Sequence, residues 1–299
     1  MTKKRTILLF GRSGSGKSSQ ASEMAEWVYS KTGLKTVLYT GDRGGLDPMQ
    51  PLIDAGIIIP VEMNTTDPFI FLNKACRGMI PDAAGKWVAP SEKFGMYVFE
   101  SMRSYAEAMM ASLISRVAGG ANIGGTSNVN FTVTENGENV KVSGSNMAMF
   151  GVVQSRITEE VWASQRLDAP YILWTSSLSK DDDTMAAGKI LGPDVIGKAL
   201  TSEVPRWFQL SFRIDQKPAQ QGQPAKHILF LGTSVDPNAG NATVLGNLRL
   251  PIDAPPLPAT LEPASLPKAI EMIDAAFAKA SDKLKARLAS SAPKVTAKS

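Results

Sequence analysis

The chain has almost none of the residues on which disulfides and histidine-rich metal centres depend. Its 299 residues include one cysteine, Cys76, and one histidine, His227. A single cysteine excludes an internal disulfide and fits a reducing compartment. A single histidine argues against zinc sites built on several histidines and against Ser-His-Asp hydrolysis. No apolar run approaches the ~20 residues of a membrane span, so we expect a cytoplasmic protein with no membrane segment.

Outside the end of the chain, neither positive nor negative charge is in clear excess. The net charge is +4, but the stretch from Lys279 to Lys298 carries six basic residues and one acid, so the remainder is slightly acidic. A basic tail attracts polyanions such as nucleic acid, and it also keeps a chain end solvated. The body of the chain has no charge signature of nucleic-acid binding.

The phosphate-loop pattern G-x-x-x-x-G-K-[ST] occupies Gly11 to Ser18. The apolar run 7–10 before it predicts a buried strand, and the stretch 18–29 after it predicts a helix. In that context backbone N–H groups converge on an anion, Lys17 reaches the β- and γ-phosphates, and the Ser18 hydroxyl ligates Mg²⁺. We therefore expect ATP and Mg²⁺ as cofactors, with the phosphates bound by Gly11, Arg12, Ser13, Gly14, Ser15, Gly16, Lys17, Ser18 and Ser19.

Helical and strand-like segments alternate along the first 250 residues, which favours an α/β fold with a parallel sheet. We expect strands at 6–10, 35–40, 57–61, 96–99, 171–175, 206–214 and 227–231. Helices are expected at 67–79, 105–117 and 147–167. We assign residues 1–250 to one core.

An insertion and a C-terminal appendage interrupt or follow this core. Between about 120 and 147 the composition changes to Gly, Asn, Ser and Thr, and two alternating segments flank Asn136-Gly137. This pattern predicts a β-hairpin arm. Residues 251–263 hold five prolines and predict a stiff linker. Residues 264–299 combine an amphipathic helix with the basic tail, and the helix either packs on the core or contacts another subunit.

A second acidic motif is expected where a buried strand ends near the phosphate loop. Met96 to Phe99 are apolar, and Glu100 follows them directly. Triphosphate hydrolysis needs a carboxylate near the metal, so Glu100 is a candidate catalytic residue and, with Ser18, a candidate Mg²⁺ ligand. An ordinary acid at the start of a helix would give the same pattern.

Five further motifs follow one another along the chain: 41–48 (GDRGGLDP), 55–57 (AGI), 99–101 (FES), 173–176 (LWTS) and 197–200 (GKAL). In the order and spacing of these motifs, the chain resembles RecA-type recombinases from about Ile7 to Leu231. It is similar in particular to the minimal RecA-fold ATPases of bacteriophages, some of them recombination or single-strand-annealing proteins. The resemblance implies a RecA-like P-loop NTPase with a central, mostly parallel sheet flanked by helices, and a host cytoplasm for a phage protein.

The resemblance also implies roles for three further residues. Asp42 stands where the family has the acid that activates water, although it also suits a turn cap before Gly44-Gly45. Thr175 or Ser176 stands where the family senses the γ-phosphate. Phage members carry a Lys-x-Arg pair before Leu-Pro, and this chain keeps the arginine, Arg249, but lacks the lysine. Arg249 is therefore a candidate trans-acting catalytic residue in a homo-oligomer.

The partners implied are single-stranded DNA and another protein. The loop 176–198 falls where RecA proteins contact DNA, and it holds Lys180, Lys189 and Lys198 but also the acidic run 181–183. The basic tail is a second candidate DNA contact, and the weakly charged hairpin arm is a candidate protein contact.

Three functions remain open at this point. The first is a RecA-fold ATPase that hydrolyses ATP and acts on DNA in phage-type recombination or replication. The second is a nucleotide-dependent assembly protein with weak or no turnover. The third is a small-molecule P-loop kinase, which is disfavoured because the chain has no arginine-rich lid to neutralise a phosphate in transfer.

Overall fold

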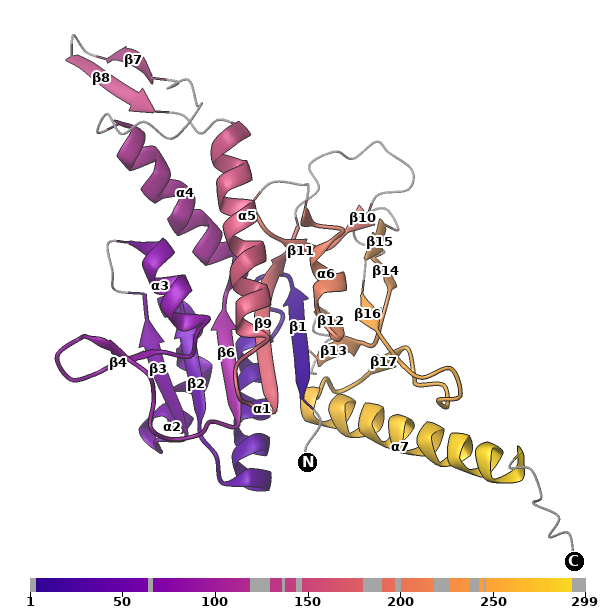
Figure 1. Ribbon diagram of the computed structural model, residues 1–299. Coiled ribbons are helices and arrows are strands. Elements are labelled where there is room, and N and C mark those ends of the chain that lie inside the picture. Colours follow the sequence, from indigo (N-terminus) through magenta and orange to yellow (C-terminus); the bar gives the residue numbers. More distant parts are fainter. Residues whose placement is uncertain are drawn as a thin grey trace, which may run out of the picture.

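The computed structural model describes residues 4–63, 67–118, 130–135, 138–143, 147–179, 190–196, 200–217, 226–236, 242–244 and 246–291. Its centre is a sheet with the strand order β17-β13-β12-β1-β9-β6-β2-β3 (Figure 1). Six of these strands are parallel: β1 (Arg5–Gly11), β2 (Thr36–Thr40), β3 (Ile58–Glu62), β6 (Met96–Glu100), β9 (Tyr171–Leu178) and β12 (Leu210–Lys217). The two at the far edge, β13 (Lys226–Phe230) and β17 (Thr260–Leu261), are antiparallel. The expected α/β fold with a mostly parallel sheet is confirmed.

Helices cover both faces of this sheet, as a buried parallel sheet requires. On one face lie α3 (Pro68–Ala75), α4 (Met102–Ala118) and α5 (Met147–Ser164), and on the other lie α1 (Lys17–Thr32) and α7 (Leu266–Ser291). Successive side chains of a strand point to opposite faces. In β1, Leu8 and Phe10 pack in the first layer while Ile7 and Leu9 pack in the second.

Several predicted boundaries are wrong. The helix expected to reach residue 79 ends at Ala75, because Gly78 turns the chain with a φ of 70°. The helix expected from 105 begins at Met102, and the helix expected to reach 167 ends at Ser164. The strand expected from 206 is preceded by a short helix, α6 (Val204–Trp207), and begins at Leu210.

The predicted hairpin arm is confirmed. Its strands, β7 (Asn130–Glu135) and β8 (Glu138–Ser143), form an antiparallel sheet of their own, and Glu135 pairs with Glu138. The expected Asn136-Gly137 turn lies outside the described residues. Figure 1 shows the arm beyond the ends of α4 and α5, away from the central sheet.

The remaining elements are short. The helix α2 (Gln50–Asp54) precedes β3. The minor strands are β4 (Ile80–Pro81), β5 (Trp87–Val88), β10 (Ile190–Leu191), β11 (Pro193–Asp194), β14 (Ser234–Asp236), β15 (Ala242–Val244) and β16 (Asn247–Leu248). Among the described helices none is long and apolar enough to cross a membrane.

The proline-rich stretch 251–263 and helix α7 are attached to the core. Thr260–Leu261 extends the central sheet by pairing with β13. The first half of α7 packs against α1 through Leu266, Ile270 and Ile273, all fully buried. Its second half extends away from the sheet, so that α7 is half core element and half exposed rod (Figure 1).

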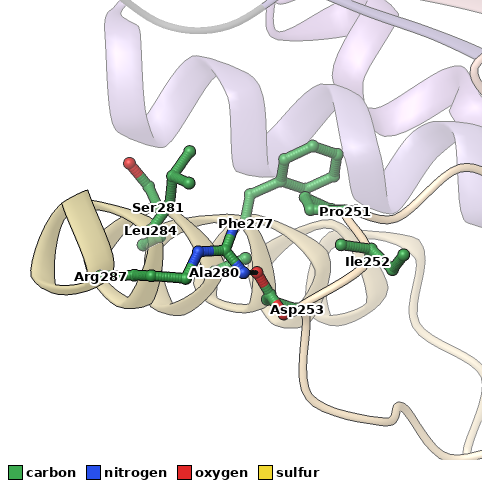
Figure 2. A pocket seen from close by; sticks show the side chains of 9 residues that line it. Pro251, Ile252, Asp253, Phe277, Ala280, Ser281, Leu284 and Arg287 are labelled. Atoms are coloured by element: carbon green, nitrogen blue, oxygen red, sulfur yellow. Dashed lines mark ion pairs between the residues drawn. The ribbon is translucent and has the colours of Figure 1, made fainter. Parts of the chain in front are cut away.

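An apolar groove of about 550 Å³ lies where this exposed half begins (Figure 2). It is formed by the segment 251–253 on one side and by Phe277 and Leu284 of α7 on the other. Arg287 pairs with Asp253 at 3.5 Å across it. The groove is on α7, and none of the predicted nucleotide-site residues lines it.

Candidate nucleotide site

The phosphate loop connects β1 to α1 through two glycines in left-handed backbone conformations. Gly14 has a φ of 74° and Gly16 a φ of 94°, a region in which side chains with a Cβ are strained. Gly16 is the N-cap of α1 and provides no side-chain hydrogen bond to the helix. The first N–H groups of α1 therefore receive no side-chain cap, as in helices that bind an anion at this end.

Lys17 folds back over this loop. Its Nζ donates hydrogen bonds to the carbonyl oxygens of Gly11, at 3.1 Å, and Arg12, at 3.0 Å. Burial lowers the pKa of Lys17, while the carboxylates of Glu100 and Asp42 act in the opposite direction. The ammonium is thus held at the loop by two backbone carbonyl groups.

Glu100, at the end of β6, meets Ser18 as the sequence predicts. The Ser18 hydroxyl donates to Glu100 Oε1 at 2.5 Å. The Glu100 side chain is buried, and its Oε2 has no hydrogen-bond partner among the described residues. Burial raises the pKa of Glu100 to about 7, against the Ser18 hydrogen bond and the charge of Lys17, which lower it. One hydroxyl and one under-coordinated carboxylate side by side are a fitting oxygen ligand pair for Mg²⁺.

Asp42 lies on the turn after β2, close to the same acid. Thr40 and Glu100 are paired in the sheet, so Asp42 follows two residues beyond the level of Glu100. Its Oδ1 accepts the N–H of Gly44 at 3.0 Å, which is the turn-capping role considered above. Asp42 also raises the pKa of Glu100 by its charge. The Asp42 side chain is exposed, and this capping bond engages one of its two carboxylate oxygens.

Strand β9 lies between β1 and β6 and places its polar residues beside the loop. The predicted Thr175 pairs with Leu9, two residues before Gly11, and is fully buried; its Oγ1 has no hydrogen-bond partner in the described part of the chain. Ser176 points to the other face and donates to the carbonyl of Asp194. The residue level with Gly11 is Ser177, which the sequence did not single out, because the register of β9 against β1 was unknown.

Arg249 lies apart from these residues. It follows β16, whose Leu248 pairs with Leu210 at the start of β12. Leu210 pairs in turn with Ile7 of the neighbouring β1, four residues before Gly11. Four residues of a β-strand span about 13 Å. Nη2 of Arg249 donates to the carbonyl of Arg206 at 2.8 Å. The structure does not bring Arg249 to the phosphate loop of its own chain.

One residue at the loop was missed entirely. Nδ1 of His227, on β13, lies 2.8 Å from the carbonyl oxygen of Ser15. A Cβ added at Gly16 would lie 2.9 Å from the same nitrogen. From the sequence, His227 served only as an argument against histidine-rich zinc sites and Ser-His-Asp hydrolysis. Its contact with Ser15 depends on the pairing of β13 with β12, more than 200 residues further along the chain.

Comparison with known proteins gives a likeness in overall arrangement only. No protein-family profile matches the chain, and no curated protein is similar in sequence. The solved structures that are similar in part include the following two. The flagellar accessory protein FlaH from Methanocaldococcus jannaschii has 9% identity and a TM-score of 0.39 over 77% of this chain and 79% of its own. A KaiC-like protein from Pyrococcus horikoshii OT3 has 12% identity and a TM-score of 0.37 over 81% of this chain and 88% of its own.

Proposed function

We propose that this chain binds ATP with Mg²⁺ at the loop 11–19 and hydrolyses it. The observation that carries the proposal is the Ser18–Glu100 hydrogen bond of 2.5 Å. It joins the helix that leaves the phosphate loop to the acid that ends a second buried strand. The side chains of Ser18, Glu100 and Lys17 thereby meet at one edge of the sheet. The left-handed conformations of Gly14 and Gly16 beside them suit a loop that wraps a polyphosphate.

Each residue of the proposed site has a role that follows from its position. Lys17 would leave the carbonyls of Gly11 and Arg12 to contact the β- and γ-phosphates, and Ser18 and Glu100 would hold Mg²⁺. Bound Mg²⁺ would supply neutralisation of the phosphate charge. Asp42 would accept a hydrogen bond from the attacking water and so orient it.

Thr175 and Arg249 complete the proposal from outside the loop. The Thr175 hydroxyl is buried without a described partner, which suits a group that responds when the γ-phosphate is bound. Arg249 is exposed and at least about 13 Å from the level of Gly11 by strand rise. We therefore propose that it acts on the nucleotide of a neighbouring subunit in a homo-oligomer.

The resemblance to phage RecA-type ATPases extends the proposal to single-stranded DNA and to recombination or replication. The candidate DNA-contacting lysines, Lys180, Lys189 and Lys198, lie outside the described residues, as do Lys294 and Lys298 of the tail. Turnover that increases with single-stranded DNA and loses this increase with added salt would support the extension. Turnover indifferent to DNA would contradict it.

The central test replaces Lys17 by alanine, with Lys31→Ala as the matched control. Lys31 is on the same helix and pairs with Glu271 at the surface. Binding of ATP stabilises a protein by about 2.7 kcal/mol at a hundredfold excess over Kd. We expect wild type and Lys31→Ala to show the thermal shift and phosphate release, and Lys17→Ala to show neither. A full shift in Lys17→Ala would overturn the proposed site.

A second candidate, nucleotide-dependent assembly without turnover, is favoured by one observation. The arm of β7 and β8 forms a sheet separate from the core and beyond the ends of α4 and α5, a place that suits contact with another molecule. This candidate predicts oligomers with a non-hydrolysable ATP analogue and negligible phosphate release. Light scattering and a phosphate assay on the same sample separate the two.

A further inference from the structure

We propose that His227 is a positioning residue that holds the phosphate loop in its anion-binding shape. The inference rests on the proposed nucleotide site and adds a residue to it. His227 lies on β13, next to β12, on the same face as the buried Leu229 and α1. From there its ring contacts the loop at Ser15 and Gly16.

The hydrogen bond to Ser15 fixes the direction of one peptide unit. A backbone carbonyl only accepts, so Nδ1 of His227 carries the proton and donates it to the Ser15 oxygen at 2.8 Å. The peptide that joins Ser15 to Gly16 is planar, and in a trans peptide the C=O and N–H point in opposite directions. Holding the Ser15 carbonyl toward His227 therefore turns the Gly16 N–H away from β13, as a donor for the phosphates.

The ring also supports Gly16 sterically. A Cβ at Gly16 would lie 2.9 Å from Nδ1 and 3.1 Å from Cε1 of His227. The imidazole thus packs directly against the one loop residue that has both a φ of 94° and the N-cap position of α1. Loss of the ring removes this support at the point where the loop turns into the helix.

His227 is itself held in place by the start of α7. Its carbonyl accepts the N–H of Ala264 at 2.8 Å. The carbonyl of Ala264 accepts Gln20 Nε2 at 3.2 Å, and Gln20 Oε1 accepts the N–H of Leu266 at 2.6 Å. Gln20 in turn donates its N–H to the Gly16 carbonyl at 2.9 Å. A closed circuit of hydrogen bonds therefore runs from the loop through β13 and α7 back to the loop.

The test compares His227→Leu with the conservative changes His227→Asn and His227→Gln. Leucine keeps the bulk and removes the donor, asparagine places its amide nitrogen about where Nδ1 lies, and glutamine places it one methylene further out. Leu229→Ala, two residues along the same strand, is the control for a loss of packing alone. Calorimetry gives Kd for MgATP and for inorganic tripolyphosphate, and thermal unfolding without ligand gives Tm.

Loss of one hydrogen bond corresponds to about a three- to tenfold weaker Kd. We expect this for both ligands in His227→Leu and His227→Gln, with His227→Asn within about twofold of wild type. Leu229→Ala should lower Tm and leave Kd unchanged. A wild-type Kd in His227→Leu, or equal losses in the asparagine and glutamine variants, would overturn the inference alone. Absence of MgATP binding by the wild type would overturn the proposed function with it. If His227→Leu does not fold, the comparison of asparagine with glutamine still decides.

Discussion

The buried carboxyl of Glu100 makes the stability of the ligand-free protein depend on pH. Its side chain is 4% exposed, and burial raises its pKa from 4.5 to about 7. Between these two values the folded protein holds a proton that the unfolded chain has released. The free energy of unfolding therefore falls as the pH rises through this window, and the stabilising contribution is complete only below about pH 4.5.

Glu100→Gln removes this titration and keeps the shape of the side chain. At 1.36 kcal/mol per pKa unit, the shift corresponds to about 3 kcal/mol over the whole window, of which about 2–3 kcal/mol falls between pH 5 and pH 8. We expect the stability of Glu100→Gln relative to wild type to increase by that amount over this range. Urea unfolding with a chelator present, at unit steps of pH, measures the difference, and titrations common to both proteins cancel.

Ser18→Ala provides the second arm of this experiment. The Ser18 hydroxyl lowers the pKa of Glu100 through its hydrogen bond, so its removal should move the pH window upward. A stability difference between Glu100→Gln and wild type that does not change with pH would refute the assignment of a buried, proton-binding carboxyl at this position.

Three further predictions concern residues outside the phosphate loop. Subunits carrying Arg249→Ala, mixed with subunits carrying Lys17→Ala, should regain part of the wild-type turnover, and no recovery at any ratio would exclude action in trans. Ile270→Ala should lower the free energy of unfolding by about 2–5 kcal/mol because Ile270 is fully buried, whereas Leu284→Ala, on the exposed half of α7, should cost under about 1 kcal/mol; equal effects in urea unfolding would contradict the packing of α7 described above. Thr175→Val should leave the stability of the ligand-free protein unchanged or raise it by about 1 kcal/mol, since a buried hydroxyl is removed, and should reduce phosphate release; unchanged release would argue against γ-phosphate sensing.

Local patterns predicted the elements that depend on local physics. The strand before Gly11, the glycine-rich turn and the helix after it follow from apolar runs and backbone freedom, and the strand ending at Glu100 follows from four apolar residues and an acid. Their meeting at Ser18 agrees with the expectation that a second acidic motif lies where a buried strand ends near the phosphate loop. The hairpin arm followed from alternating residues around Asn136-Gly137.

The features that the sequence did not predict depend on strand register and on pairing between strands that are far apart in the chain. The level of Ser177 beside Gly11 is set by how β9 aligns with β1, and a shift by two residues would have favoured Thr175. The contact of His227 with Ser15 depends on β13 being the neighbour of β12. The early end of α3 results from the backbone of Gly78, which outweighs a helical pattern of apolar residues that continues to residue 79.

The presence of a single histidine, noted first as a deficiency, has a practical consequence. In a proton NMR spectrum of the unlabelled protein, the imidazole resonances all belong to one side chain, and that ring lies 2.8 Å from the backbone of Ser15. The ring of His227 is therefore a natural spectroscopic probe at the rim of the loop, and binding of a nucleotide at the proposed site should shift its resonances without a mutation or an isotope label.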